Sequence, residues 1–279
     1  MAAGLKKVPK SVLVFGASGR VGSQVIHALQ QEQPDIRMRL VTTSESKKPE
    51  LEKAWQSSEV VIADFFNEPS LHDVVKDMEG VFVVTPGSVN GQTAMTNLVK
   101  ALKESGNKLI HVIRITAMFP DLNPRRIPKR LVDPGLGLPI QSPIAKRFSK
   151  KAFFRAVPYM DIADIGEAAA RLLLSPDERH IGLFHNINNG TDLLRIEDVA
   201  QVMGRVWQVE VTADTSKEGF LNEYTGISKE RREYLWEFFK FEKCNEVCWS
   251  LNDFAERILG RKPKTLVQWL IGNKSDMLE

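Results

Sequence analysis

Three glycines recur at a spacing of three residues near the start of the chain, within Val14–Gly22 (VFGASGRVG). A short apolar run precedes them and apolar residues at helical spacing follow them, which predicts a strand, a tight turn and a helix. In such a turn the first glycine permits the bend, the second lets a pyrophosphate approach the backbone, and the third allows close packing of the helix. The helix N-terminus adds free N–H groups and a positive dipole. The segment therefore predicts a dinucleotide site, in which the phosphate-binding residues are Gly16, Ala17, Ser18, Gly19, Arg20, Val21 and Gly22.

The residues after the second predicted strand, Ile36–Thr42, bear on which dinucleotide binds. An NAD site usually has an acid at the tip of this strand, about 20 residues after the glycines. Asp35 lies before the strand, at the wrong end, whereas Glu45 lies just beyond the tip and leaves NAD open as an alternative. Hydroxyl and basic side chains suit a 2′-phosphate better, so we favour NADP. The alternative for the two lysines is that they are solvated residues at the start of a helix and contact no ligand. The candidate contacts are Thr43, Ser44 and Lys47, with Lys48, Arg20 and Arg39 as further cations.

Five β-rich runs alternate with helical patterns over the first 116 residues. The runs are Ser11–Phe15, Ile36–Thr42, Val60–Ala63, Val81–Thr85 and Leu109–Thr116. Strands separated by helices indicate right-handed crossovers and a parallel sheet, so the fold class is α/β, a doubly wound Rossmann sheet. Ligands of such sheets bind at the carboxyl ends of the strands.

The pattern breaks from Ala117 to Tyr159, where prolines and basic residues accumulate. Beyond it we expect a capping box at Asp164 before a helix over Ile165–Leu174, a strand over Gly182–Asn188, and a helix over Ile196–Val206. The rest is mostly helical, and its aromatic residues form either a packed core or an apolar substrate pocket. The sequence thus predicts two domains, a Rossmann domain over 1–160 and a smaller, mostly helical substrate or lid region over 161–279. The aromatic residues are Phe220, Tyr224, Tyr234, Trp236, Phe238, Phe239 and Phe241.

An ordered series of short motifs resembles the NmrA-like group of atypical short-chain dehydrogenases/reductases. Besides the glycine loop, the motifs are Ala63-Asp64-Phe65, Val84-Thr85-Pro86, Arg114-Ile115-Thr116-Ala117, Asp161–Gly166 and Leu259–Pro263. The resemblance covers most of the chain apart from the middle. It implies that Asp64 and Phe65 flank the adenine, that Thr85 and Pro86 line the cofactor groove, and that Thr116 lies near the nicotinamide.

Two departures from the wider family concern catalysis. The Tyr-x-x-x-Lys pair of ordinary short-chain enzymes is absent, because the residues four positions after Tyr159, Tyr224 and Tyr234 are Ala163, Ser228 and Phe238. Some atypical relatives use a lysine after the fifth strand instead, and Lys146 is the nearest match, so Lys146 and Thr116 are the candidate catalytic groups. The middle segment is also shortened, and a sixth strand with its substrate loop is reduced or missing.

These observations favour an NADP(H)-dependent oxidoreductase of the NmrA-like type that acts on a small apolar carbonyl, enone or quinone compound. The alternative is a non-catalytic NAD(P)-binding regulator or redox sensor that acts through a protein partner. The missing Tyr-x-x-x-Lys and the shortened middle favour the regulator, and the aromatic C-terminal region favours the enzyme.

Composition and charge bear on the binding partners and the cellular location of the protein. The 38 basic and 35 acidic residues give a net charge of +3, which argues against nucleic acid as the main partner. Without a signal-like or membrane-spanning run, and with two cysteines predicted to stay reduced, the sequence predicts a cytoplasmic protein that does not bind membranes. We expect no metal site, because the histidines are scattered: His27, His72, His111, His180 and His185.

Overall fold

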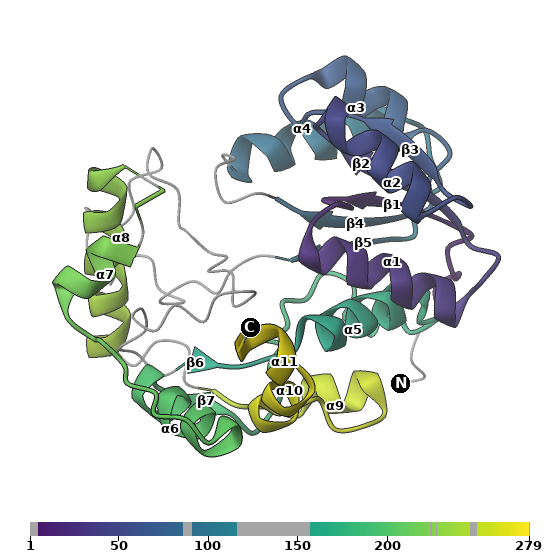
Figure 1. Cartoon of the computed structure of the whole chain (residues 1–279). Helices are drawn as coiled ribbons and strands as arrows, with labels where there is room; N and C mark the ends of the chain where they lie inside the picture. Colours follow the sequence, from purple (N-terminus) through teal and green to yellow (C-terminus); the bar gives the residue numbers. More distant parts are fainter. Residues whose placement is uncertain are drawn as a thin grey trace. The chain divides into compact units, whose positions relative to one another are not determined.

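The computed structural model describes residues 5–85, 91–115, 157–223, 225–226, 228–245 and 250–278. The chain divides into two compact units (Figure 1). The first comprises Met1–Thr116 and Ile162–His185, and the second comprises Ala117–Asp161 and Asn186–Glu279. The sequence prediction divided the chain after residue 160, whereas the contacts group Ile162–His185 with the first unit.

The first unit is built on a five-stranded sheet with the order β3-β2-β1-β4-β5. Its ladders are all parallel, so the predicted doubly wound α/β class is confirmed. Parallel pairing brings the carboxyl ends of neighbouring strands to the same edge. From β1 the sheet continues to β2 and β3 on one side and to β4 and β5 on the other, so the topological switch point lies between β1 and β4. The strands are β1 (Ser11–Phe15), β2 (Arg37–Thr42), β3 (Glu59–Ile62), β4 (Gly80–Val84) and β5 (His111–Ile115).

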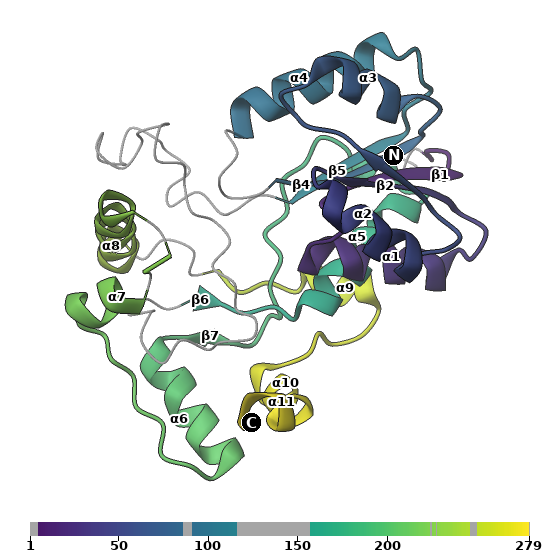
Figure 2. The same cartoon turned by 45° about the horizontal axis from the view of Figure 1, so that its top comes forward.

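Helices cover both faces of this sheet because its strands are apolar on both sides. Alternate residues of β1 enter separate cores: Val12 and Val14 pack in one, Leu13 and Phe15 in the other. The first core is completed by α1 (Arg20–Glu32), α2 (Lys48–Ala54) and α5 (Ile162–Leu174). The second core is completed by α3 (Glu68–Val75) and α4 (Gly91–Glu104), and Figures 1 and 2 show α3 and α4 on the sheet face opposite to α1 and α5.

Helices α1 and α5 approach each other closely at Gly166. A Cβ at this position would lie 2.5 Å from the Cβ and 2.6 Å from the backbone carbon of Gln24 on α1. The sequence motif that ends at Gly166 therefore includes a helix-crossing residue. Helix α5 begins at Ile162, so the predicted start at Ile165 was wrong, and Asp164 lies in the first turn rather than before it.

The part of the second unit that the structure describes is mostly helical, as the sequence predicts for the C-terminal region. Its β6 (Val157–Pro158) and β7 (Leu193–Leu194) form a short antiparallel pair. A core of Val199, Met203 and Trp207 packs against Leu266 and Leu270, and the Trp207 indole N–H donates to the Leu270 carbonyl at 3.1 Å. The helices are α6 (Ile196–Trp207), α7 (Lys217–Glu223), α8 (Lys229–Asn245), α9 (Phe254–Leu259), α10 (Leu266–Gly272) and α11 (Lys274–Leu278).

The predicted strand over Gly182–Asn188 does not form. Gly182 adopts φ +75°, a left-handed conformation that interrupts an extended strand. The Asn188 side chain then binds backbone groups: its Oδ1 accepts from the N–H of neighbouring Gly190 at 3.0 Å and from the N–H of the distant Asn252 at 3.2 Å. Such side-chain bonds compete with the ladder that a strand would need.

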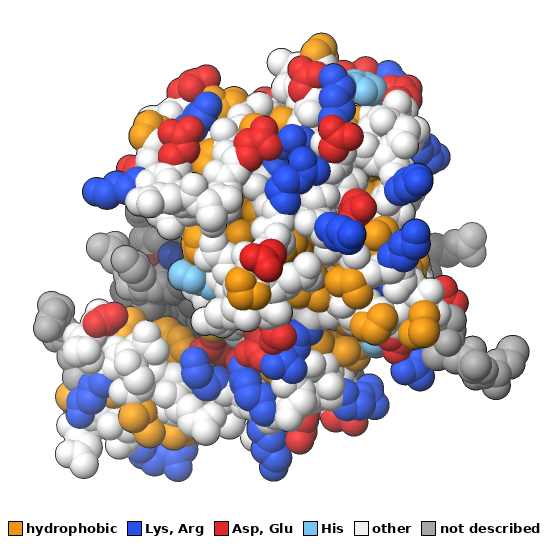
Figure 3. Space-filling view, turned by 90° about the vertical axis from the view of Figure 1, so that its right-hand side faces the viewer, with side chains coloured by type: hydrophobic (Ala, Val, Ile, Leu, Met, Phe, Trp, Pro, Cys, Tyr) orange, Lys and Arg blue, Asp and Glu red, His pale blue; other side chains and the backbone are white. Residues whose placement is uncertain are grey.

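Charged side chains of both signs are intermingled on the face of the molecule that Figure 3 shows. Among the described helices, none combines the length and the apolar character that crossing a bilayer requires.

Candidate functional site

The turn between β1 and α1 forms as the glycine spacing predicts. Gly16 adopts φ +76°, and the Gly19 N–H donates to the Gly16 carbonyl at 2.9 Å, which closes the turn. The Ser23 N–H then donates to the Gly19 carbonyl at 2.9 Å, so that Gly19 is the N-cap and α1 begins at Arg20. The chain thus passes from a buried strand to a helix N-terminus within four residues.

Two of the three glycines are required by close contacts. A Cβ on Gly16 would lie 2.5 Å from Val84 Cγ1 on β4, and a Cβ on Gly22 would lie 2.1 Å from the Gly16 carbonyl oxygen. Gly19 is exposed, and its nearest contact for a Cβ, again the Gly16 carbonyl oxygen, is 3.1 Å away. The turn therefore packs tightly against β4 and against the first turn of α1. On its solvent side, Gly19 exposes backbone atoms that no side chain covers.

The electrostatics of the α1 N-terminus suit an anion. None of the first-turn residues is acidic, and Gly19 provides no side-chain cap for the helix N–H groups. The unsatisfied N–H groups and the helix dipole together attract negative charge. Arg20 and Ser18 are exposed beside this end, Val21 is half-buried, and Ala17 is fully buried beneath the turn.

The tip of β2 presents hydroxyl groups and a lysine. Thr42 is buried and its Oγ1 accepts from the Ser44 N–H at 3.2 Å, which orders the tip. Thr43 is exposed, and the Ser44 and Ser46 hydroxyls are 2.7 Å apart. Lys47 is exposed in the 3₁₀ turn Glu45–Lys47, whereas Lys48 forms an ion pair with Glu52 at 3.8 Å.

Arg39 was wrong as a candidate phosphate contact. Its Nε lies 2.7 Å from a Glu59 carboxylate oxygen, and its Nη1 donates to the Val74 and Lys76 carbonyls, both at 2.9 Å. Through these contacts the Arg39 guanidinium links β2 to β3 and to the end of α3. Arg39 is therefore a structural residue.

The Asp64-Phe65 motif follows β3 at the same edge of the sheet. Asp64 is exposed, and its Oδ1 accepts from the Phe66 N–H at 3.0 Å, which forms a tight local turn. Phe65 is 5% exposed and its ring stacks on Phe15 with centroids 4.9 Å apart, so the side chain belongs to the core. The exposed aromatic ring in this loop is Phe66, at 51%, which the sequence analysis did not single out.

The remaining predicted residues divide into two groups. Thr85 directly follows β4 and is half-buried. Pro86, Thr116 and Lys146 lie outside the described residues. In the described part, the structure thus brings the glycine turn, the β2 tip, Asp64 and Thr85 to the carboxyl edge of one sheet.

Comparisons with known proteins agree with this geometry. Residues 16–131 match the model of a family described as NAD(P)H-binding. No curated protein matches the chain. A triphenylmethane reductase from Citrobacter sp., crystallised with NADP(H), is 18% identical with a TM-score of 0.72, over 94% of this chain and 99% of that one.

Two other solved structures are similar to nearly the whole chain. An NADPH-dependent quinone oxidoreductase from Escherichia coli, in complex with NADPH, is 17% identical with a TM-score of 0.68, over 93% of this chain and 98% of that one. A structure of pinoresinol-lariciresinol and phenylcoumaran benzylic ether reductases is 14% identical with a TM-score of 0.68, over 95% and 99%. At these identities the structures demonstrate a shared fold, and the family match assigns NAD(P)H binding to the glycine-loop region.

Proposed function

We propose that this chain is a member of the NmrA-like group of the atypical short-chain dehydrogenases/reductases and an NADP(H)-dependent oxidoreductase. Its substrate is a small apolar carbonyl, enone or quinone compound. The observation that carries the proposal is the turn in which Gly22 lies against the Gly16 carbonyl, because it places the N-terminus of α1 directly after β1, and helix N-termini bind phosphates.

The residues of this turn fit a dinucleotide pyrophosphate. Gly19 leaves room above the backbone, the first turn of α1 is free of acids, and Arg20 is exposed beside it. A phosphate can therefore accept from the helix N–H groups without meeting a Cβ or a carboxylate. The proposed pyrophosphate contacts are Gly16, Ala17, Ser18, Gly19, Arg20, Val21 and Gly22.

The β2 tip supports NADP over NAD. Thr43 and Ser44 offer hydroxyl groups and Lys47 offers an exposed cation, whereas an NAD site would use an acid to hold both ribose hydroxyls. We assign the 2′-phosphate to these three residues. Glu45 begins the same 3₁₀ turn, and its carboxylate would oppose that phosphate.

The adenine lies beside Asp64 and the backbone of Phe65 in this proposal, since the Phe65 ring is buried against Phe15. Thr85 and Pro86 line the groove near the ribose and pyrophosphate. Thr116 and Lys146 are the proposed polar assistants at the nicotinamide end. The bound cofactor supplies a hydride to an electrophilic carbon, and the chain contributes orientation and electrostatic support.

The names of the similar structures support this substrate class: triphenylmethane dyes, quinones and benzylic ethers all contain unsaturated, conjugated carbon rings. The direct test is consumption of NADPH by the full-length chain in the presence of quinones, enones and triphenylmethane dyes. Substrate-dependent oxidation of NADPH is the expected result. Tight binding of NADPH with no consumption across the panel would overturn the proposal and favour a regulatory role.

A further inference from the structure

The loop that follows β3 carries an exposed aromatic ring at the carboxyl edge of the sheet. Phe66 is 51% exposed, whereas the preceding Phe65 is buried against Phe15. A single exposed apolar side chain is ordinary on a protein surface. What the Phe66 ring can bind therefore depends on which site residues lie around it.

Hydrogen bonds from its own turn and from α4 hold the backbone under this ring. The Asp64 Oδ1 accepts from the Phe66 N–H at 3.0 Å, and the Asp64 carbonyl accepts from the Asn67 N–H at 3.0 Å. From α4, the Asn97 Nδ2 donates to the Phe65 carbonyl at 2.9 Å. The loop therefore presents the Phe66 side chain from a fixed backbone, and little conformational freedom is lost when a ligand covers the ring.

The tip of β2 lies directly beside this loop. Thr42 pairs with Ile62 in the parallel ladder, and the Ala63 N–H donates to the Thr42 carbonyl at 3.1 Å. Ser44 comes two residues after Thr42, and Phe66 comes three residues after Ala63. Two segments that leave adjacent strands at a paired position cannot separate far over so few residues. The proposed 2′-phosphate contacts and the Phe66 ring thus lie at the same end of the sheet edge.

The covalent structure of NADP(H) places its adenine at this end. The 2′-phosphate is attached to the ribose that also carries the adenine, so a 2′-phosphate at the β2 tip brings the adenine to the neighbouring loop. Asp64 and the Phe65 backbone, the proposed neighbours of the adenine, offer polar groups. Phe66 offers a flat apolar surface, and aromatic rings stack on the faces of purines.

We propose that the Phe66 ring stacks on the adenine of the bound cofactor and thereby sets much of the affinity for it. The inference rests on the proposed NADP(H) binding and adds the residue that covers the face of the adenine. Because NADPH and NADH share the adenine, the ring strengthens the binding of both, whereas Lys47 discriminates between them. Stacking requires a planar side chain, so an aliphatic residue does not replace Phe66.

Calorimetric titration of the full-length chain with NADPH and with adenosine 2′,5′-bisphosphate tests the proposal. The bisphosphate contains the adenine and the 2′-phosphate but no nicotinamide, so it reports on this end of the site alone. Phe66→Ala should lower the affinity for both ligands by at least about tenfold, and Phe66→Leu by at least about threefold. Phe66→Tyr keeps the planar ring and should change either affinity by less than about twofold.

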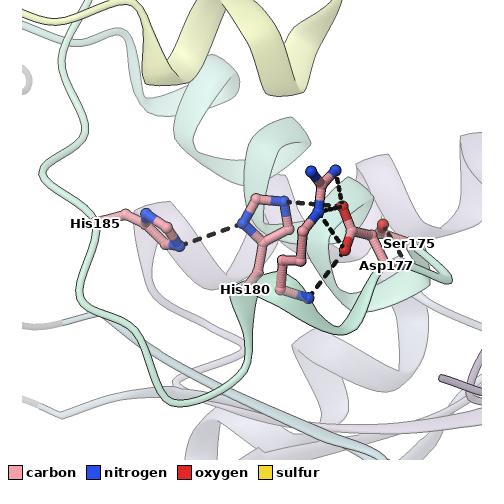
Figure 4. Close-up of polar contacts among 5 residues, drawn as sticks. Ser175, Asp177, His180 and His185 are labelled. Carbon is pink, nitrogen blue, oxygen red and sulfur yellow. Dashed lines mark hydrogen bonds and ion pairs between the residues drawn. The ribbon is translucent and has the colours of Figure 1, made fainter. Parts of the chain in front are cut away.

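Phe184→Ala is the matched control, since Phe184 is also an exposed aromatic residue of the first unit. It precedes His185, whose Nε2 is hydrogen-bonded to His180 Nδ1 at 3.3 Å (Figure 4). The His180 Nε2 lies 4.0 Å from Asp177, which pairs with Leu5 ahead of β1. This segment therefore lies on the side of the sheet where the chain enters β1, and Phe184→Ala should leave both affinities unchanged.

Thermal melts without ligand should be alike for all variants, because both phenylalanines are exposed. An unchanged affinity in Phe66→Ala, or a loss in Phe66→Tyr as large as in Phe66→Ala, would overturn the inference and leave NADP(H) binding in place. A natural chain that binds both ligands but consumes no NADPH with any substrate would overturn the reductase activity and leave the stacking in place. A natural chain that binds neither ligand would overturn both.

Discussion

Gly22 lies so close to Gly16 that a Cβ on Gly22 would be 2.1 Å from the Gly16 carbonyl oxygen and 2.8 Å from its carbonyl carbon. Backbone atoms cannot move aside as the end of a flexible side chain can. The contact ties the first turn of α1 to the end of β1. The proposed phosphate cradle and the packing of α1 therefore depend on the same residue.

Replacing Gly22 by Ala should weaken NADPH binding by more than about tenfold and lower the free energy of unfolding by about 1 to 3 kcal/mol, as overpacked sites do. Fluorescence titration with NADPH and urea unfolding measure the two effects. Gly272→Ala is the matched control, because a Cβ there meets nothing within 4 Å and its φ is not in the left-handed range. Unaltered NADPH affinity in Gly22→Ala would contradict the assignment of the cradle.

Gly166→Ala tests the crossing of α5 over α1. The added Cβ would meet the backbone carbon of Gln24 at 2.6 Å, which forces the helices apart. We expect the urea midpoint to fall by an amount equivalent to about 1 to 3 kcal/mol. An unchanged midpoint, next to an unchanged Gly272→Ala control, would mean that the two helices separate without cost.

Lys47→Ala tests the 2′-phosphate assignment. Loss of this cation should weaken NADPH binding by about tenfold, equivalent to about 1.4 kcal/mol, and leave NADH binding unchanged. Lys53→Ala provides the control, since Lys53 is an exposed cation in the last turn of nearby α2. Equal losses for NADPH and NADH, or none for either, would remove Lys47 from the site.

His111 should make stability depend on pH. Burial, then the charge of Lys6, lowers its pKa from 6.5 to about 4, and its Nδ1 is buried with no hydrogen-bond partner among the described residues. Between these values the unfolded chain binds a proton that the folded chain does not, so stability is complete above pH 6.5 and falls as the pH drops toward 4.

The measurement is urea unfolding at about pH 7 and about pH 5, on either side of the ordinary histidine pKa. His111→Leu should lose less stability on acidification than the natural chain does. His72→Gln should lose as much as the natural chain. A pH dependence that is the same with and without His111 would assign the proton uptake to other groups.

Local sequence signals were sufficient for the five strands of the parallel sheet and for the glycine turn. Ser11–Phe15 is confirmed residue for residue, because a buried parallel strand needs an unbroken apolar run and Gly16 ends it. Gly182–Asn188 also contains apolar residues, but its Asn186 carbonyl accepts from the Asn252 side chain, and its Asn188 side chain bonds to the backbone of residues 250 and 252. Those partners lie more than 60 residues away in sequence, so no local pattern identifies them.

The sequence predicts the positions of site residues that act through their backbone, such as those of the glycine turn. It predicts less well which side chains are exposed to a ligand. Phe65 and Phe66 are indistinguishable by type, yet Phe65 is buried on Phe15 and Phe66 is exposed. Arg39 looked available because its partners, Glu59 on β3 and two carbonyls at the end of α3, are distant in sequence. The hydrogen bond between His180 Nδ1 and His185 Nε2, at 3.3 Å, was missed because it depends on the left-handed Gly182 between them (Figure 4).

The most direct test of NADP(H) binding is a thermal melt of the full-length chain with saturating NADPH, with saturating NADH, and with neither. A ligand at 100 times its dissociation constant stabilises the folded state by about 2.7 kcal/mol. We predict a clear upward shift with NADPH, a smaller one with NADH at the same concentration, and a smaller NADPH shift in Gly22→Ala than in the natural chain. A cooperative transition that neither cofactor moves in the natural chain would contradict the account.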